Sequence, residues 1–217
     1  MRIHLTTKDH ECSSQSYKQL QNQQCFAEVL IFIILLPVLF FICISSFDMT
    51  QMIQSGDMDL QEGLVQAVKG AAGRVDLYSQ AIGAKQIIPD DAHASFRSML
   101  VKNIGLDSVT LAPLTKSYSA APSYCMLVYN GTTSGAQANK KHFFNGTSVS
   151  QSALIASGFP KAFVISGTDI IVGSGTGSIT LEETGVIAVI NIAQKDLLNN
   201  SDRTLSRWAA ARIKTSN

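Results

Sequence analysis

The sequence is poor in charge and has no surplus of either sign. Charged residues make up 15% of its 217 residues, and 17 Lys and Arg stand against 16 Asp and Glu. Nucleic-acid-binding proteins normally carry a clustered basic excess, so this class is excluded. The hydrophobic share of 46% is enough for the core of one ordinary domain, or of a small domain with an appendage.

Cysteine and histidine are scarce, with four residues of each. Beyond residue 47 the sequence holds one cysteine, Cys125, so no disulfide framework is expected there, and we predict that it is a small buried apolar residue. His93 is expected to be structural or exposed. The histidines lack the spacing of a zinc site or a catalytic triad: His4, His10, His93 and His142. We therefore predict no metal, no cofactor and no catalytic residue in a protein that is not an enzyme.

Long apolar runs are absent except for one, over residues 26–47. Between Val29 and Phe47 the only ionisable side chain is that of Cys43. At about 1.5 Å rise per residue this stretch reaches roughly the ~30 Å of a bilayer's hydrocarbon core, so we predict a transmembrane helix over 26–47. A cleaved secretory signal would have a shorter apolar region behind a basic start, and a buried helix of a globular core would show a polar face.

The charges that flank the apolar run predict its orientation. Arg2, Lys8 and Lys18 precede it, and the first basic residue after it is Lys69. Basic residues stay on the cytoplasmic side of a membrane. We predict a single-pass protein of the cell membrane, with residues 1–25 as a cytoplasmic polar leader and residues 48–217 outside the cytoplasm.

Residues 48–107 carry two helical patterns. Apolar residues recur at helical spacing over residues 60–75, which predicts a stalk helix, and a second helix is predicted over 90–104. Asp90 or Asp91 is expected to cap the second helix, and Gly105 to close it. Its expected buried face is Phe96, Met99, Leu100 and Ile104.

Residues 108–200 change to short runs rich in Val, Ile and aromatic residues, typical of strands: 125–129, 162–166, 169–173, 178–182 and 185–193. We predict an α+β fold in which two or three helices pack on one antiparallel sheet. Strands 178–182 and 185–193 are expected to form a hairpin. Residues 130–150 are expected to form an exposed loop, and residues 201–217 a short basic helix that docks on its own domain or meets a membrane or partner.

Two short motifs suggest chemistry but lack the required context. The glycine-rich residues 173–177 precede a strand instead of a helix, so a turn is favoured over a phosphate-binding loop. Asn130, Asn145 and Asn199 match the glycosylation acceptor pattern, which is short enough to occur by chance.

Glu28 stands inside the beginning of the apolar run. It has two interpretations. A carboxylate near a membrane boundary reaches the headgroups at little cost. Alternatively, it neutralises a positive group on a neighbouring subunit, because a buried charge requires such a partner.

The polar leader, Glu28, Pro37 within the apolar run, Asp48 behind it and the following helix rich in small residues and Gln resemble the TadE/TadG-like, pseudopilin-like proteins of pilus assembly. The resemblance covers about residues 25–78. It implies a non-enzymatic, minor-pilin-like or assembly subunit of a surface appendage or secretion system, with Glu28, Pro37 and Asp48 as its membrane and assembly residues. Implied partners are the lipid bilayer, other pilus or secretion-system subunits, and further copies of the membrane helix; no nucleic acid is expected.

Two other functions stay open on the sequence alone. A membrane-tethered extracytoplasmic ligand-binding or sensor domain predicts a concave apolar pocket in the exported part. A tethered hydrolase predicts an essential polar residue, for which the sequence offers no candidate.

Overall fold

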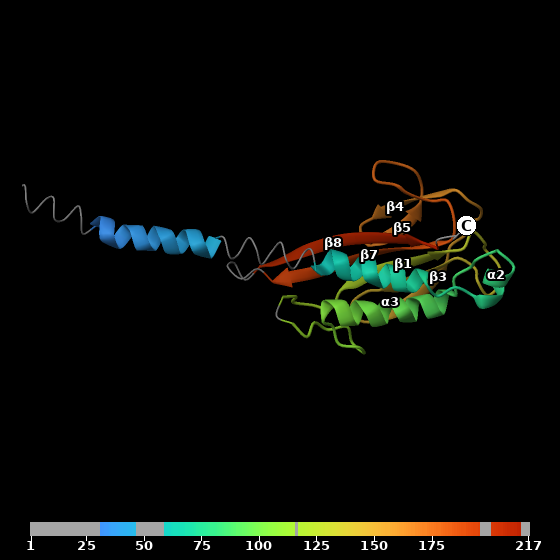
Figure 1. The fold of residues 1–217 in the computed structure, drawn as a ribbon, viewed down its shortest axis with the longest axis horizontal. Helices are drawn as coiled ribbons and strands as arrows, with labels where there is room; N and C mark the ends of the chain where they lie inside the picture. Colours follow the sequence, from blue (N-terminus) through green and yellow to red (C-terminus); the bar gives the residue numbers. More distant parts are fainter. Residues whose placement is uncertain (1–30, 47–58, 116, 196–200, 214–217) are drawn as a thin grey trace, which may run out of the picture. The chain divides into compact units, whose positions relative to one another are not determined.

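The computed structural model describes residues 31–46, 59–115, 117–195 and 201–213. The chain divides into two compact units, Met1–Gln54 and Ser55–Asn217. In the first unit the described residues, 31–46, are helical throughout. The second unit, which we call the head, holds the remaining described residues (Figure 1).

The predicted transmembrane helix over residues 26–47 is wrong. In the described ranges, no helix combines the length and the apolar character that crossing a bilayer requires.

The head contains helices followed by strands. A helix over residues 59–72 comes first. The other elements in chain order are α2 (Leu77–Ala81), α3 (Pro89–Ile104), β1 (Ser123–Tyr129), β2 (Lys140–Phe144), β3 (Val149–Ala153), β4 (Lys161–Ser166), β5 (Asp169–Val172), β6 (Ile179–Leu181), β7 (Gly185–Lys195) and β8 (Asp202–Arg212).

The fold of the head is α+β, with two antiparallel sheets in its described part. One sheet has five strands in the order β3-β2-β1-β7-β8, and the other has three in the order β5-β4-β6. Helix 59–72 and α3 lie on one face of the larger sheet, and β4 and β5 lie on its other face (Figure 1). The expectation of a single sheet is therefore wrong.

Strands β1 and β7 are covered on both faces. They pair along their length, from Ser123 opposite Asn191 to Tyr129 opposite Gly185. Alternate side chains point to opposite faces of a strand, so the two faces build two cores. Met126, Val128, Val186, Ala188 and Ile190 pack with the helices, whereas Cys125, Leu127, Tyr129, Ile187 and Val189 pack with the smaller sheet.

Both helical patterns of residues 48–107 are found in the structure. The apolar stripe of helix 59–72 is buried, with Leu60, Leu64 and Val68 inaccessible to solvent. Helix α3 ends as expected, because Gly105 takes the left-handed conformation at φ 73° that glycine adopts without strain.

Details of α3 differ from the expectations. Among the described residues no side chain caps its N-terminus, where Ile88 stands before Pro89. Asp90, expected as a cap, forms an ion pair with Lys140 of β2 instead. Met99 is 39% exposed instead of buried, because its side chain lies over Gly70 at the edge of the helix pair.

The predicted hairpin of residues 178–182 and 185–193 is wrong, and so is the single exposed loop over 130–150. Strand β6 pairs with β4 in the smaller sheet, whereas β7 pairs with β1 and β8. β7 has eleven residues whose backbone groups need partners, and a three-residue β6 can pair with only a few of them, whereas β1 and β8 pair along most of its length. Residues 140–144 form β2, because His142 and Phe144 bury against α3.

The predicted C-terminal helix over residues 201–217 is also wrong. Residues 202–212 form β8, which pairs with β7 over its whole length. Leu205 and Ala209 are the buried residues of β8. A spacing of four places two side chains on one face of a helix and of a strand alike, so the pattern was ambiguous and the long apolar β7 decided it.

One buried side chain, Asn130, joins three segments of the head. Its Oδ1 accepts the backbone N–H of Ile87, and its Nδ2 donates to the backbone carbonyls of Ile87 and Gln137. Its own backbone N–H donates to Asn139. Asn130 is 5% exposed, so the Asn-Gly-Thr pattern at this position marks a structural residue in the folded head.

We expect Asn130→Ala to lower the free energy of unfolding by about 2–4 kcal/mol, because it leaves the N–H and C=O of Ile87 buried without partners. The matched control is Asn145→Ala, which changes an exposed asparagine of the same Asn-Gly-Thr pattern and should cost less than about 1 kcal/mol. Denaturant unfolding of the two variants measures both values. Equal losses would contradict the role given to Asn130.

Candidate functional site

The structure describes one of the three predicted assembly residues. Pro37 lies in the helical residues 31–46 and is exposed. Glu28 and Asp48 lie outside the described residues. The predicted grouping of a carboxylate, a proline and a second carboxylate therefore stays a prediction.

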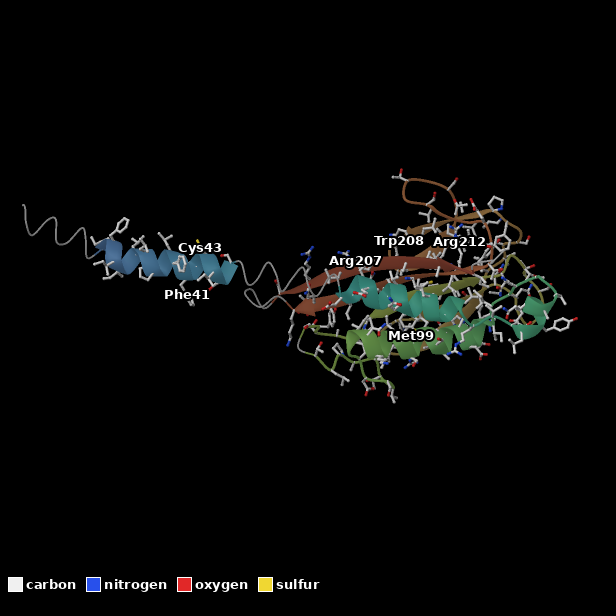
Figure 2. All side chains as sticks on the ribbon, viewed as in Figure 1. Phe41, Cys43, Met99, Arg207, Trp208 and Arg212 are labelled. Atoms are coloured by element: carbon white, nitrogen blue, oxygen red, sulfur yellow. The ribbon has the colours of Figure 1, made fainter. Side chains whose placement is uncertain are left out.

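The helical residues 31–46 present a continuous apolar surface. Every large apolar side chain of this segment is exposed, from 48% at Ile44 to 72% at Phe41. Figure 2 labels Phe41 and Cys43 on it, and Cys43 is a free thiol. Exposed apolar surface of this extent is typical of interaction sites. We call residues 31–46 the apolar helix.

In the head, the structure brings together two histidines that are 49 positions apart in the sequence. His93 stands in the first turn of α3, and His142 stands on the face of β2 that meets α3. Their rings stack with centroids 4.3 Å apart and an interplanar angle of 5°. The Nε2 atom of His93 is hydrogen-bonded to the hydroxyl of Tyr124 at 2.9 Å. The contacts of His93 with His142 and Tyr124 agree with the expectation that it is a structural residue.

His142 is fully buried, and among the described residues no group meets hydrogen-bond geometry with either of its ring nitrogens. The nearest carboxylate is that of Asp90, 4.0 Å from Nε2. Buried polar atoms without partners are rare in folded proteins and cost free energy. Stacking on His93 is the principal contact of this ring with another polar side chain.

Burial keeps both histidines neutral at pH 7. It lowers the pKa of His93 from 6.5 to about 4, with a further lowering by Arg97 and an opposing effect of Asp90. Burial also lowers the pKa of His142 to about 4. His93 and Lys140 lower it further, whereas Asp90 and the backbone of Pro89 raise it. Asp90 has a lowered pKa of its own, chiefly because Lys140 donates a hydrogen bond to it.

A second polar contact joins the two sheets. Lys141 of β2 points away from the histidines and forms an ion pair with Asp169 of β5 at 2.8 Å. The thiol of Cys125 lies 3.9 Å from the same carboxylate, and burial raises its pKa to about 12. Cys125 is inaccessible to solvent, which confirms the prediction of a buried cysteine. A thiol in this state is an unreactive packing residue.

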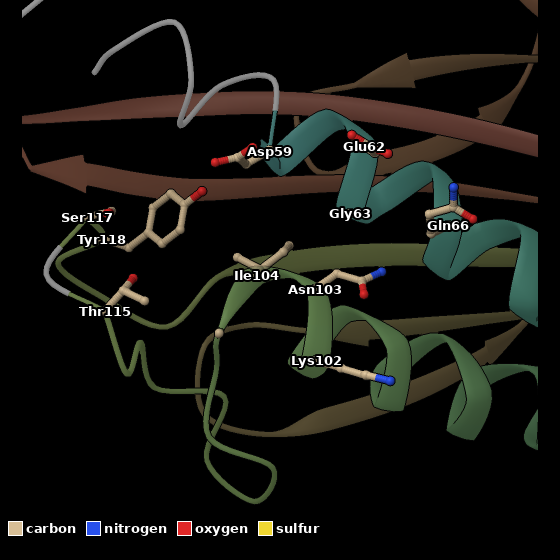
Figure 3. A pocket seen from close by; sticks show the side chains of 11 residues that line it. Asp59, Glu62, Gly63, Gln66, Lys102, Asn103, Ile104, Thr115, Ser117 and Tyr118 are labelled. Atoms are coloured by element: carbon tan, nitrogen blue, oxygen red, sulfur yellow. The ribbon is translucent and has the colours of Figure 1, made fainter. Parts of the chain in front are cut away.

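An open cleft of about 520 Å³ lies between helix 59–72 and the end of α3 (Figure 3). Most of the side chains that line it are polar: Asp59, Glu62, Gln66, Lys102, Asn103, Thr115 and Ser117, with Ile104 and Tyr118 as the apolar ones. Binding sites for small molecules are mostly apolar and bury their ligand. The cleft therefore differs from the enclosed pocket that a sensor domain predicts.

The described residues contain no metal centre, and similarity to known proteins suggests no function for the head. Within the described ranges, no group of three or more His, Cys, Asp or Glu side chains is placed to hold a metal ion. No protein-family model, curated protein or solved structure matches the chain. The resemblance to TadE/TadG-like proteins accordingly stays a prediction.

We expect the stability of the protein to rise with pH between about 4 and 6.5. Because the folded pKa of each histidine lies below its unfolded value, the unfolded chain binds more protons in this window. Each histidine contributes a slope of up to about 1.4 kcal/mol per pH unit to the free energy of unfolding. Above about pH 6.5 the histidine is neutral in both the folded and the unfolded chain, so its contribution no longer changes with pH. The lowered pKa of Asp90 places its own contribution below this window.

The variant His142→Phe keeps an aromatic ring over His93 and removes one titrating group. Its slope of unfolding free energy against pH between 4 and 6.5 should be about half that of the unmodified chain. Denaturant unfolding at closely spaced pH values measures both slopes. An unchanged slope would contradict the assignment of the pH dependence to this pair.

Proposed function

We propose that the protein is a non-enzymatic, minor-pilin-like assembly subunit of a surface appendage or secretion system. Its apolar helix packs against apolar helices of neighbouring subunits, including further copies of itself. The head is the folded part that the assembled subunit presents. The cell membrane as its location and the extracytoplasmic side as the place of the head stay predictions from the flanking charges.

The observation that carries the proposal is the exposure of the apolar helix. Twelve large apolar side chains in residues 31–46 are exposed, and the segment has an apolar residue on every side of the helix. Polar contacts supply little binding energy on such a surface, whereas burial of each large side chain contributes about 1.5–3 kcal/mol. A helix of this composition is therefore suited to packing with other apolar helices.

The head favours a structural role by its construction. Its titratable groups with strongly shifted pKa values serve as packing residues. His142, Tyr124 and Cys125 are buried, and His93 is half-buried. Catalytic groups with shifted pKa values normally line an accessible cleft. The open cleft beside Lys102 is the place where the alternative, a ligand-binding or sensor domain, would bind a small polar ligand.

The test is affinity purification of the tagged full chain from its native cells, with mass spectrometry of the proteins that co-purify. We expect appendage or secretion-system subunits with the unmodified chain, and their loss with Ile34→Asp, which puts a charge on the apolar helix. Ile155→Asp is the matched control, because Ile155 is an apolar residue of the head with 94% exposure. It should leave the co-purified proteins unchanged.

Two results would contradict the proposal. One is a set of co-purified proteins without any appendage or secretion-system subunit. The other is an unchanged set for Ile34→Asp, since the contact would then not use the apolar helix. Saturable binding of a small polar ligand that is lost on Lys102→Glu would favour the sensor alternative.

A further inference from the structure

Strand β8 is the long edge of the five-stranded sheet. It pairs with β7 through all eleven residues from Asp202 to Arg212. Among the described residues no strand pairs with its other side. The opposite edge, β3, has five residues. Long edges with unpaired backbone groups are templates for a further strand, and proteins normally protect them with proline, charged side chains, a bulge or a covering helix or loop. β8 has three arginines, of which only Arg207 lies within residues 204–211. The sequence of β8, DRTLSRWAAAR, contains neither proline nor lysine.

The backbone directions along β8 follow from two hydrogen bonds. The carbonyl of Trp208 accepts a bond from the Nε2 of Gln61 at 3.2 Å, on the side away from β7. The N–H of Ile213 donates to the carbonyl of Thr184, on the side of β7. Backbone groups alternate between the two sides of a strand. The even-numbered residues therefore direct their N–H and C=O outward: Thr204, Ser206, Trp208 and Ala210.

A groove of about 470 Å³ runs along this outer side at the middle of β8. It is lined by Gln61 and Val65 of helix 59–72 and by residues 206–210 of β8. Trp208 contributes its carbonyl to the groove, whereas its side chain, 48% exposed, lies on the face of β8 opposite Leu205 and Ala209. Large aromatic side chains that are half exposed at a sheet edge are typical anchors of protein interfaces.

We propose that a second copy of this chain occupies the groove, with the two β8 strands paired antiparallel about a two-fold axis at Trp208. The pairing joins the two five-stranded sheets into one continuous sheet. In this register Trp208 faces its own counterpart, and Ser206 faces Ala210 of the second copy. The Trp208 carbonyl exchanges its side-chain donor, Gln61, for a backbone N–H of the partner strand.

The charges of β8 are compatible with this register. Arg207 lies opposite Ala209 of the second copy, and Arg212 lies opposite Thr204. No two charges of the same sign in β8 are directly opposite each other. Arg212 is also diagonal to Asp202 of the second copy, at a separation that long side chains bridge. A two-fold pairing needs a surface that is complementary to itself. In this register the pairs of Arg212 with Asp202 provide that complementarity, whereas the two Arg207 side chains, diagonal to each other across the axis, oppose it.

The dimer does not depend on the proposed function. It uses β8 and the groove of the head, whereas the assembly proposal rests on the apolar helix. Variants at Trp208 leave residues 31–46 unchanged, so each proposal can fail without the other.

The test measures the mass of the full chain by sedimentation, in a detergent that shields the apolar helix. We expect a dimer for the unmodified chain and a monomer for both Trp208→Glu and Trp208→Lys, because each variant places two like charges opposite each other at the axis. An equal mixture of the two variants should recover the dimer, because Glu then faces Lys. Ile155→Glu is the matched control and should stay dimeric.

Recovery of the dimer on mixing supports the proposal, because loss of folding in either variant would not be repaired in this way. A monomeric unmodified chain would overturn it, as would a dimer that persists in both Trp208 variants. Two monomeric variants that stay monomeric on mixing would also overturn it, since residue 208 would then not face itself.

Discussion

The head depends on the burial of β1 and β7 on both faces. Apolar side chains point to both faces of each of these strands, so both faces must be shielded from solvent. The two strands are neighbours within the larger sheet. Helix 59–72 and α3 cover one face, and the β4–β6 sheet covers the other. Burial of a large apolar side chain contributes about 1.5–3 kcal/mol to the free energy of unfolding. The summed contribution of these two cores therefore exceeds that of any single polar contact in the head.

The polar contacts then fix how the layers sit on the central strands. Asp90, His93 and His142 hold the beginning of α3 against β2, and Lys141 with Asp169 joins the larger sheet to the smaller one. Adjacent residues of β2 thus serve opposite faces of the sheet. Asp90 forms an ion pair with Lys140 at the surface, and its charge also raises the pKa of the buried His142.

The sequence was most informative where its periodicity was long and unambiguous. Helix 59–72, α3 with Gly105, and the strands β1, β4, β5, β6 and β7 followed from apolar spacing. The sequence failed at β8, because Leu205 and Ala209 fit both periods, and at β2, because Lys-Lys-His-Phe-Phe looks like part of a polar loop until Phe144 and His142 meet α3. The stacked histidines could not be found by motif spacing, since tertiary packing of α3 on β2 creates the pair. The described part of the apolar run, residues 31–46, is helical as predicted, whereas its prediction as a membrane span is wrong.

Native-state amide hydrogen exchange of the full chain tests most directly whether the central strands hold the head together. The slowest amides should lie in β1 and β7, and the amides of α3 and β4 should lose protection no later than theirs, because both layers rest on these strands. An α3 or β4 that stays protected while β7 exchanges freely would show that a layer is stable without the central strands, and would contradict the account.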